Sequence, residues 1–252
     1  MDEIQVKSKQ RVAEHGEVFT AAREVNAMLD LVKNETERIE SRFLEPACGD
    51  GNFLAEILRR KLAAVKKKYG SKGNDKRKRP DFELWSVIAV MSIYGVELLP
   101  DNAAACRERL FGIWDDAYTE NNKKDASAQC REVVRFILSR NILCGDALTL
   151  TDEEGKPIVF SEWGILTGGL VKRTDYTLAE LLTQEQFEPD AIPMMNDKPD
   201  KVDFQLRLFD DTDTSSDSEK SEGRRVAQFK PIHYLQLGIR SVESGECNEG
   251  NR

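Results

Sequence analysis

The fold of this chain is decided by the stretch Phe43-Leu44-Glu45-Pro46-Ala47-Cys48-Gly49-Asp50-Gly51-Asn52-Phe53-Leu54. The short apolar segment from Arg42 to Ala47 predicts a buried strand that ends in a glycine turn. The two glycines let the backbone turn tightly and approach a ligand closely. Apolar side chains then recur at helical spacing, which predicts a helix that begins near Gly51 and runs to about Lys68. This order is typical of the ligand-binding edge of an α/β sheet.

Helical and strand patterns alternate through the first 165 residues. Apolar spacing predicts further helices over residues 20–39, 82–90, 100–117 and 130–138. Short apolar runs predict strands over residues 93–98, 141–144 and 157–160. Alternation of this kind predicts an α/β fold with a mainly parallel sheet and helices on both faces.

Composition and charge narrow the function classes. The chain has 252 residues, a net charge of -8 and a pI near 5.1, which argues against tight binding of duplex DNA by this chain alone. The five cysteines form no C-x-x-C pair and there are two histidines, so we expect reduced thiols and no metal cluster. Without a signal peptide or a membrane-length apolar run, the sequence predicts a cytoplasmic protein with no membrane partner.

Carboxylates stand at the ends of three predicted strands. Glu45 ends the first strand, Glu97 closes the second within Gly-Val-Glu-Leu at 95–98, and Asp146 follows the third within Gly-Asp-Ala-Leu at 145–148. Glu97 is placed to accept the hydroxyls of a ribose, and Asp146 is placed to accept a hydrogen bond from an adenine amino group. Each residue alone is more often an ordinary strand end, but three in this order after a glycine turn indicate a nucleoside site.

The charge beside the turn indicates which nucleoside. Glu45 and Asp50 flank the turn and suit a cation better than a pyrophosphate, which favours S-adenosylmethionine with its sulfonium and ammonium groups. A nicotinamide dinucleotide is the distant alternative, because its fingerprint needs a third glycine where this chain has Leu54.

These motifs together resemble the adenine-specific DNA methyltransferases of restriction–modification systems. The resemblance covers roughly residues 10–165, and upstream it includes Gly-Glu-Val-Phe-Thr at 16–20, although Ala21 stands where the family has proline. It implies a class I methyltransferase sheet of the Rossmann type, with S-adenosylmethionine as the cofactor. The cofactor-binding residues that it implies are Phe19, Thr20, Glu45, Ala47, Gly49, Gly51, Asn52, Phe53, Glu97, Leu98, Asp146 and Ala147.

One motif of that family is missing from the sequence. These enzymes carry Asn or Asp, two prolines and an aromatic residue after the fourth strand, where the aromatic ring stacks on a flipped base. No two prolines are adjacent here, and Glu162 and Trp163 are the candidates at this place. We favour the alternative that Trp163 packs at a strand end. The catalytic residues are therefore unknown from the sequence.

Three accounts of the function stay open. The chain is the cofactor-binding part of a DNA methyltransferase whose catalysis and target recognition come from a partner protein, an enzyme with an unfamiliar catalytic pair, or a non-catalytic binding or scaffold subunit. Under the resemblance, residues 1–40 are a helical segment that covers the cofactor and residues 41–183 are the Rossmann-like domain, with a basic loop at 66–80. That loop is a solvated insertion or, alternatively, a phosphate-contacting loop.

The last part of the chain has a different character. Residues 184–252 form an acidic tail, predicted to be disordered over 210–222, with alternation compatible with strands over 203–209 and 226–237. The sequence leaves open whether residues after 165 complete the sheet.

Overall fold

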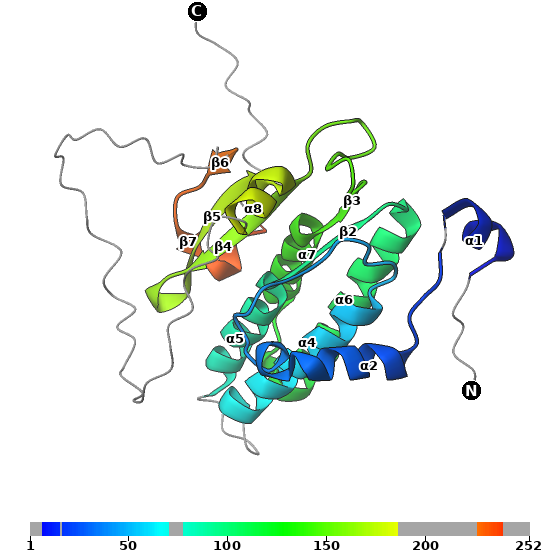
Figure 1. Cartoon of the computed structure of the whole chain (residues 1–252). Helices are drawn as coiled ribbons and strands as arrows, with labels where there is room; N and C mark the ends of the chain where they lie inside the picture. Colours follow the sequence, from blue (N-terminus) through cyan, green and yellow to red (C-terminus); the bar gives the residue numbers. More distant parts are fainter. Residues whose placement is uncertain (1–6, 16, 71–77, 186–225, 239–252) are drawn as a thin grey trace, which may run out of the picture.

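A computed structural model describes residues 7–15, 17–70, 78–185 and 226–238 (Figure 1). Its α-helices are α1 Lys9–His15, α2 Ala22–Leu31, α3 Lys33–Thr36, α4 Asn52–Tyr69, α5 Arg79–Met91, α6 Pro100–Asn122, α7 Ala128–Asn141 and α8 Leu178–Glu185. Its strands are β1 Phe43–Glu45, β2 Ile93–Glu97, β3 Ile142–Cys144, β4 Val159–Ile165, β5 Leu170–Thr177, β6 Ala227–Gln228 and β7 Ile232–His233. The short 3₁₀ helices are η2 Lys123–Asp125, η3 Thr167–Gly169 and η4 Tyr234–Gln236.

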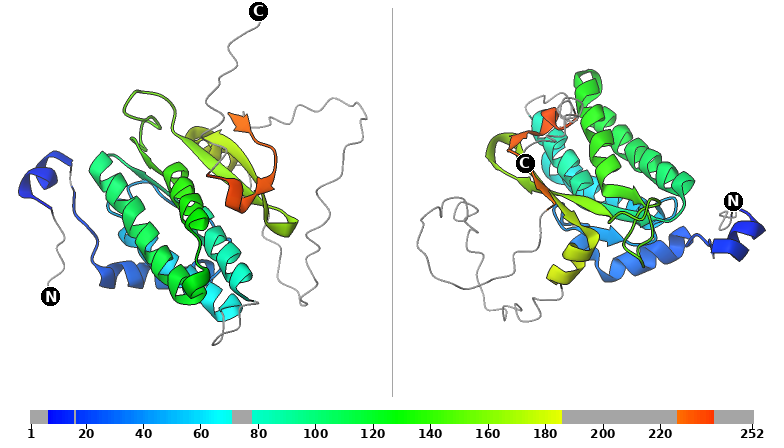
Figure 2. Two further views of the ribbon diagram at one scale, coloured as in Figure 1. Left: turned by 180° about the vertical axis from the view of Figure 1, so that it is seen from behind. Right: turned by 90° about the horizontal axis from the view of Figure 1, so that it is seen from above.

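The first sheet is parallel and has the order β1-β2-β3. Two helices join each strand to the next, α4 and α5 before β2 and α6 and α7 before β3. The view from above in Figure 2 shows α4 to α7 together on one side of these strands, with α2 and α8 on the other side. The α/β class with a parallel sheet and helices on both sides, predicted from the alternation, is therefore confirmed.

The core lies between the parallel sheet and the layer of α4 to α7. Trp114 of α6 is fully buried, stacks on Tyr118 with ring centroids 4.6 Å apart, and donates a hydrogen bond from Nε1 to Ser86 Oγ over 3.0 Å. Burial of an aromatic side chain contributes about 2–3 kcal/mol. Because the indole N–H keeps a partner, Trp114 is buried without leaving an unpaired donor.

Lys61 of α4 is buried in this layer as well. Its ammonium donates to three backbone carbonyls in the turn before β1, those of Arg38, Ile39 and Ser41. Burial lowers the pKa of Lys61 to about 7. A single side chain therefore fixes the approach of the chain to β1, and hence the position of the glycine turn that follows.

The second sheet corrects the expectation of one mainly parallel sheet. β4 pairs with β5 in antiparallel fashion, and β6 and β7 add to β5. The hairpin forms because Gly168 and Gly169 adopt positive φ angles of 73° and 75°, which glycine tolerates and which reverse the chain at once. No crossover helix follows β4, so β5 cannot run parallel to it.

The hairpin packs on the face of the parallel sheet that α4 leaves free. Gly95 of β2 faces α4, because a Cβ at this position would lie 3.0 Å from Leu54. Side chains alternate along a strand, so Tyr94 points to the opposite face, where its ring meets Phe160 of β4 at 5.5 Å, edge to face. The Tyr94 hydroxyl also donates to the backbone carbonyl of Ser161 over 3.1 Å.

Several boundaries differ from the predicted ones. The helix predicted over 20–39 is interrupted at Val32, and the strand predicted over 42–47 is the three-residue β1. β1 is an edge strand rather than a buried one, with Leu44 40% exposed. Since Phe43 N–H donates to the carbonyl of Ser92 beside β2, the N–H and C=O of Leu44 point away from the sheet, and no described residue pairs with them.

The basic loop predicted over 66–80 is shorter than expected. Lys66, Lys67 and Lys68 belong to the last turn of α4, and Arg79 begins α5, where it is buried in an ion pair with Asp125. Residues 71–77 lie outside the described ranges.

In the tail, the strand pattern over 226–237 corresponds to β6, β7 and η4. The Tyr234 hydroxyl of η4 donates to Glu83 of α5 over 2.6 Å, which ties this segment to the helix layer. The predictions of disorder over 210–222 and of a strand over 203–209 lie outside the described residues.

Candidate cofactor site

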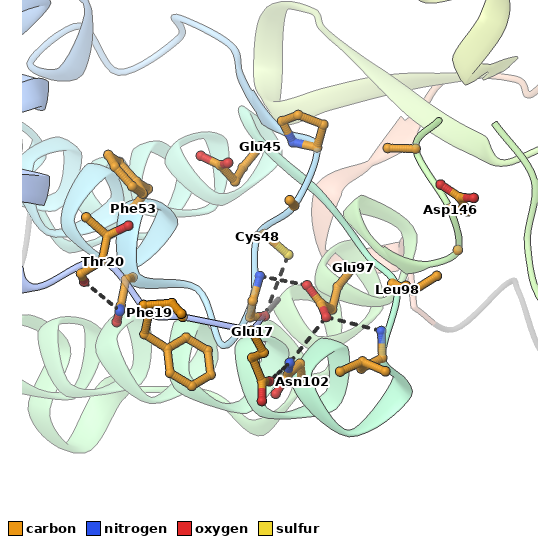
Figure 3. Close-up of a pocket in the computed structure, with 18 of the residues that line it drawn as sticks. Glu17, Phe19, Thr20, Glu45, Cys48, Phe53, Glu97, Leu98, Asn102 and Asp146 are labelled. Atoms are coloured by element: carbon orange, nitrogen blue, oxygen red, sulfur yellow. Dashed lines mark hydrogen bonds between the residues drawn. The ribbon is translucent and has the colours of Figure 1, made fainter. Parts of the chain in front are cut away.

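A cavity of about 570 Å³ lies where the carboxyl ends of β1, β2 and β3 meet. Eleven of the twelve residues predicted to bind a cofactor line it, and Gly51 is the exception. Figure 3 shows Glu45, Glu97 and Asp146 around this space, each from the end of a different strand. The remaining lining residues are Glu17, Val18, Pro46, Cys48, Leu99, Asn102, Gly145 and Leu148.

The glycine turn needs glycine at two places. Gly49 and Gly51 have φ angles of 55° and 90°, in the region that other residues rarely adopt. A Cβ on Gly49 would lie 3.2 Å from the ring of Phe19, and a Cβ on Gly51 would lie 2.7 Å from Cys106 Sγ. Gly49 therefore forms pocket wall, whereas Gly51 is turned inward against α6, which explains why it does not line the cavity.

Glu97 holds the turn in place. Its Oε2 accepts a hydrogen bond from Gly49 N–H over 2.8 Å, and its Oε1 accepts from Leu99 N–H and Asn102 Nδ2 over 3.1 and 3.2 Å. A carboxylate offers about four lone-pair positions, so about one remains, on Oε2. One ribose hydroxyl can use that position directly, and a second one needs Asn102 to move aside.

Glu45 is a carboxylate that no cation of the described residues accompanies. Partial burial raises its pKa above the ordinary glutamate range. None of the hydrogen bonds or ion pairs within the described ranges involves its side chain, and Figure 3 draws none to it. A positively charged ligand group here would relieve the cost of its ionisation.

Asp146 lies across the cavity, in the loop after β3. Its Oδ1 accepts from Leu148 N–H over 2.8 Å, which fixes the carboxylate and leaves the other oxygen for a donor on a ligand. Apolar side chains flank this side of the cavity, with Leu98 53% and Leu148 94% exposed. A flat heterocycle with an exocyclic amine fits this combination of apolar walls and one acceptor.

The N-terminal segment closes the opposite wall. Asn52 Nδ2 donates to the carbonyl of Thr20 over 3.0 Å, and Arg109 donates to Asn52 Oδ1 over 2.6 Å. Glu17 and Asn102 also line the pocket, and sequence reasoning missed both. Their positions in the sequence could have indicated them. Glu17 lies within the Gly-Glu-Val-Phe-Thr stretch at 16–20, and Asn102 lies in the first turn of the helix that follows Glu97.

Glu162 and Trp163, the catalytic candidates, lie outside the pocket. Glu162 pairs with Arg42, just before β1, over 2.7 Å. Trp163 donates from Nε1 to Asn141 Oδ1 over 2.9 Å, and Asn141 Nδ2 donates to the carbonyl of Ile93, where β2 begins. Because β4 starts beside Gly145 and runs back toward the amino ends of the strands, it carries both residues to the edge opposite the cavity. The packed tryptophan, the favoured alternative, is what the structure has.

The described residues were also searched for a metal site and for a membrane-spanning helix. Within the described ranges, no three His, Cys, Asp or Glu side chains converge closely enough to hold a metal ion. A search of the same residues found no helix with the length and apolarity needed to cross a bilayer.

Comparisons with models of known protein families, with curated proteins and with solved structures gave no significant match.

Proposed function

We propose that this chain binds S-adenosylmethionine on a class I methyltransferase-like domain and serves in the methylation of adenine in DNA, in a restriction–modification setting. The observation that carries the proposal is that Glu45, Glu97 and Asp146, from the ends of three consecutive strands, share one cavity beside the glycine turn. Resemblance of the motifs to adenine-specific methyltransferases supports the DNA substrate.

The lining suits this cofactor group by group. Glu45 is a partly buried carboxylate that lines the same cavity as Gly49 and would attract the ammonium and sulfonium of the methionine part. Glu97 would accept a ribose hydroxyl, and Asp146 would accept the adenine amine between the apolar side chains of Leu98 and Ala147. The pyrophosphate of a nicotinamide dinucleotide would instead meet carboxylates, which disfavours that alternative.

When bound, the cofactor supplies an electrophilic methyl group. The residues of this chain would orient the nucleoside, neutralise its positive charge and exclude water on the side of Phe19 and Thr20. Neither Glu162 nor Trp163 lies near enough to hold an acceptor amine. Among the described residues that line the pocket, none reproduces the missing family motif.

A second candidate follows from that deficit. The chain would then be a cofactor-binding subunit that needs a partner protein for base recognition and catalysis. The edge of β1, which no described strand covers, favours this candidate, because a strand added there would end next to Glu45 and the pocket.

Calorimetry with S-adenosylmethionine and S-adenosylhomocysteine tests the proposal. Wild type should bind both, and Asp146→Asn should weaken binding by about 1–3 kcal/mol because it places an amide donor against the adenine amine. Glu120→Gln is the matched control, since this exposed carboxylate pairs with Lys66 on the surface and does not line the cavity. No heat with wild type would refute the proposal.

A methyl-transfer assay on unmethylated DNA then separates the two candidates. Turnover by this chain alone supports a complete enzyme. Turnover only after a partner protein is added supports the cofactor-binding subunit.

A further inference from the structure

The segment that closes the pocket is attached differently from the rest of the domain. This segment, called the strap, comprises residues 7–15 and 17–20 and contributes Glu17, Phe19 and Thr20 to the pocket wall. None of its described side chains belongs to the hydrophobic core, whose first member along the chain is Val25. Segments held mainly by polar contacts open locally at a lower free energy than core elements.

Arg11 joins Glu17, another residue of the strap, to Asp101 of the domain. Its guanidinium donates to both oxygens of Glu17, over 2.5 and 2.9 Å, and to both oxygens of Asp101 at the start of α6, over 2.9 and 3.1 Å. The arm to Glu17 stays within the strap and is sheltered from solvent, since the Glu17 side chain is 7% exposed. The arm to Asp101 connects the strap to the body of the domain, and the Asp101 side chain is 54% exposed. Charge-assisted forks of this kind are among the stronger hydrogen bonds in proteins.

Asn102 carries this attachment into the pocket. Its Nδ2 donates to Glu17 Oε1 over 2.6 Å and to Glu97 Oε1 over 3.2 Å. Lys7 of the strap in turn donates to Asn102 Oδ1 and to Asp101. The strap is thus connected through one buried amide to the carboxylate that faces the candidate ribose position (Figure 3).

The other end of the strap is fixed to the start of α4, which α6 supports. Asn52 at the start of α4 holds the carbonyl of Thr20, and Arg109 of α6 holds Asn52. Immediately after Thr20, helix α2 is anchored by the buried side chains of Val25 and Leu29. Opening of the strap would therefore break the contact of Arg11 with Asp101 and that of Glu17 with Asn102, while the contact of Thr20 with Asn52 acts as the hinge.

We propose that the strap is the gate of the cofactor pocket, that Arg11 is its latch, and that Asn102 couples the latch to Glu97. The identity of the ligand rests on the proposed function, whereas the latch itself does not. Arg11 acts as a positioning residue, because it touches the gate and not the ligand. A latch that is closed both before and after binding slows entry and exit alike and leaves the affinity nearly unchanged.

Hydrogen exchange on the ligand-free chain tests the latch. Arg11→Gln should make the amides of residues 9–15 and 17–20 exchange about tenfold faster. Glutamine carries no charge and cannot donate to Glu17 and Asp101 at the same time. Arg23→Gln is the matched control, since the 91% exposed Arg23 side chain pairs with its neighbour Glu24. Asp101→Asn should reproduce much of the effect, and the double variant should add little to it. Equal exchange in the Arg11 and Arg23 variants would overturn the latch.

Binding kinetics of S-adenosylhomocysteine test the gate. Arg11→Gln should raise both the association and the dissociation rate constants by about tenfold and change Kd by less than about threefold. Arg11→Lys should recover only part of the slow exchange, because an ammonium cannot bridge two carboxylates as a guanidinium does. If Arg11→Gln raises only the dissociation rate constant and leaves the association rate constant unchanged, the strap is a fixed wall of the pocket, and the gate is overturned. If wild type binds no S-adenosyl ligand, the proposed function fails while the exchange experiment still decides the latch.

Discussion

Replacement of Gly51 by alanine should destabilise the domain through two separable effects. The φ angle of 90° costs a side chain about 1–2 kcal/mol in the left-handed region. The new Cβ would also lie 2.7 Å from Cys106 Sγ, an overlap that costs about 1–3 kcal/mol in a packed interior. Gly51→Ala should therefore lower the free energy of unfolding by about 2–5 kcal/mol, measured by urea denaturation with circular dichroism at an unchanged m-value.

The two effects can be separated by a double-mutant cycle. In a Cys106→Ala background the nearest atom to the new methyl group is the Cβ of residue 106, at an ordinary 3.5 Å, so Gly51→Ala should cost only the backbone part. Gly155→Ala is the matched control, because Gly155 has a φ angle of 76° and open space where the added methyl group would lie. An equal cost of Gly51→Ala in the wild-type and Cys106→Ala backgrounds would refute the steric reasoning.

Three further predictions concern the site, the core and the hairpin. Burial raises the pKa of Glu45, and only the ionised carboxylate attracts a cation. The affinity for S-adenosylmethionine should therefore rise with pH across that raised pKa, and the affinity of Glu45→Gln should not depend on pH in this range. Calorimetry at several pH values measures both affinities, and an equal pH dependence in Glu45→Gln would count against Glu45. Burial lowers the pKa of Lys61 to about 7, so between pH 7 and about 10 the unfolded chain binds more protons and stability should rise with pH. Lys61→Met should lose this slope and about 1–3 kcal/mol, because three carbonyls lose their donor; urea titrations that keep the slope would contradict the assignment. Trp163→Phe and Glu162→Gln should leave the affinity for S-adenosylhomocysteine unchanged, and Trp163→Phe should cost about 1 kcal/mol of stability for its lost hydrogen bond to Asn141; a tenfold weaker Kd in either variant would return these residues to the site.

The sequence predicts the lining of the candidate site more completely than it predicts the arrangement of the strands. Glu45, Glu97 and Asp146 each follow a short apolar run, and parallel strands bring such positions to one edge whatever the details of packing. Asn102, in the first turn of α6, was missed because its role depends on Glu17, which lies 85 residues away in the chain. Local patterns carry no information about a contact of that kind.

The second sheet was beyond local patterns for a different reason. Val159 to Phe160 has the composition of a buried strand, and such a run does not state which neighbour it pairs with. The antiparallel pairing of this strand is set by the chain reversal at Gly168 and Gly169, which lies beyond the predicted strand at 157–160. β1 was predicted as buried because the segment from Arg42 to Ala47 is short and apolar, yet an edge position leaves the Leu44 side chain partly in solvent.

The amide of Asn141 has a consequence for how the molecule unfolds. It donates to the carbonyls of Val90, Met91 and Ile93 and accepts from Trp163, so one side chain joins the amino edge of the parallel sheet to the β4–β5 hairpin. Removing the hairpin would expose the apolar ring of Tyr94 to water and take the Trp163 donor from the Asn141 amide oxygen. The hairpin and the half that carries the candidate site should consequently lose their structure in a single cooperative transition, as one folding unit rather than two.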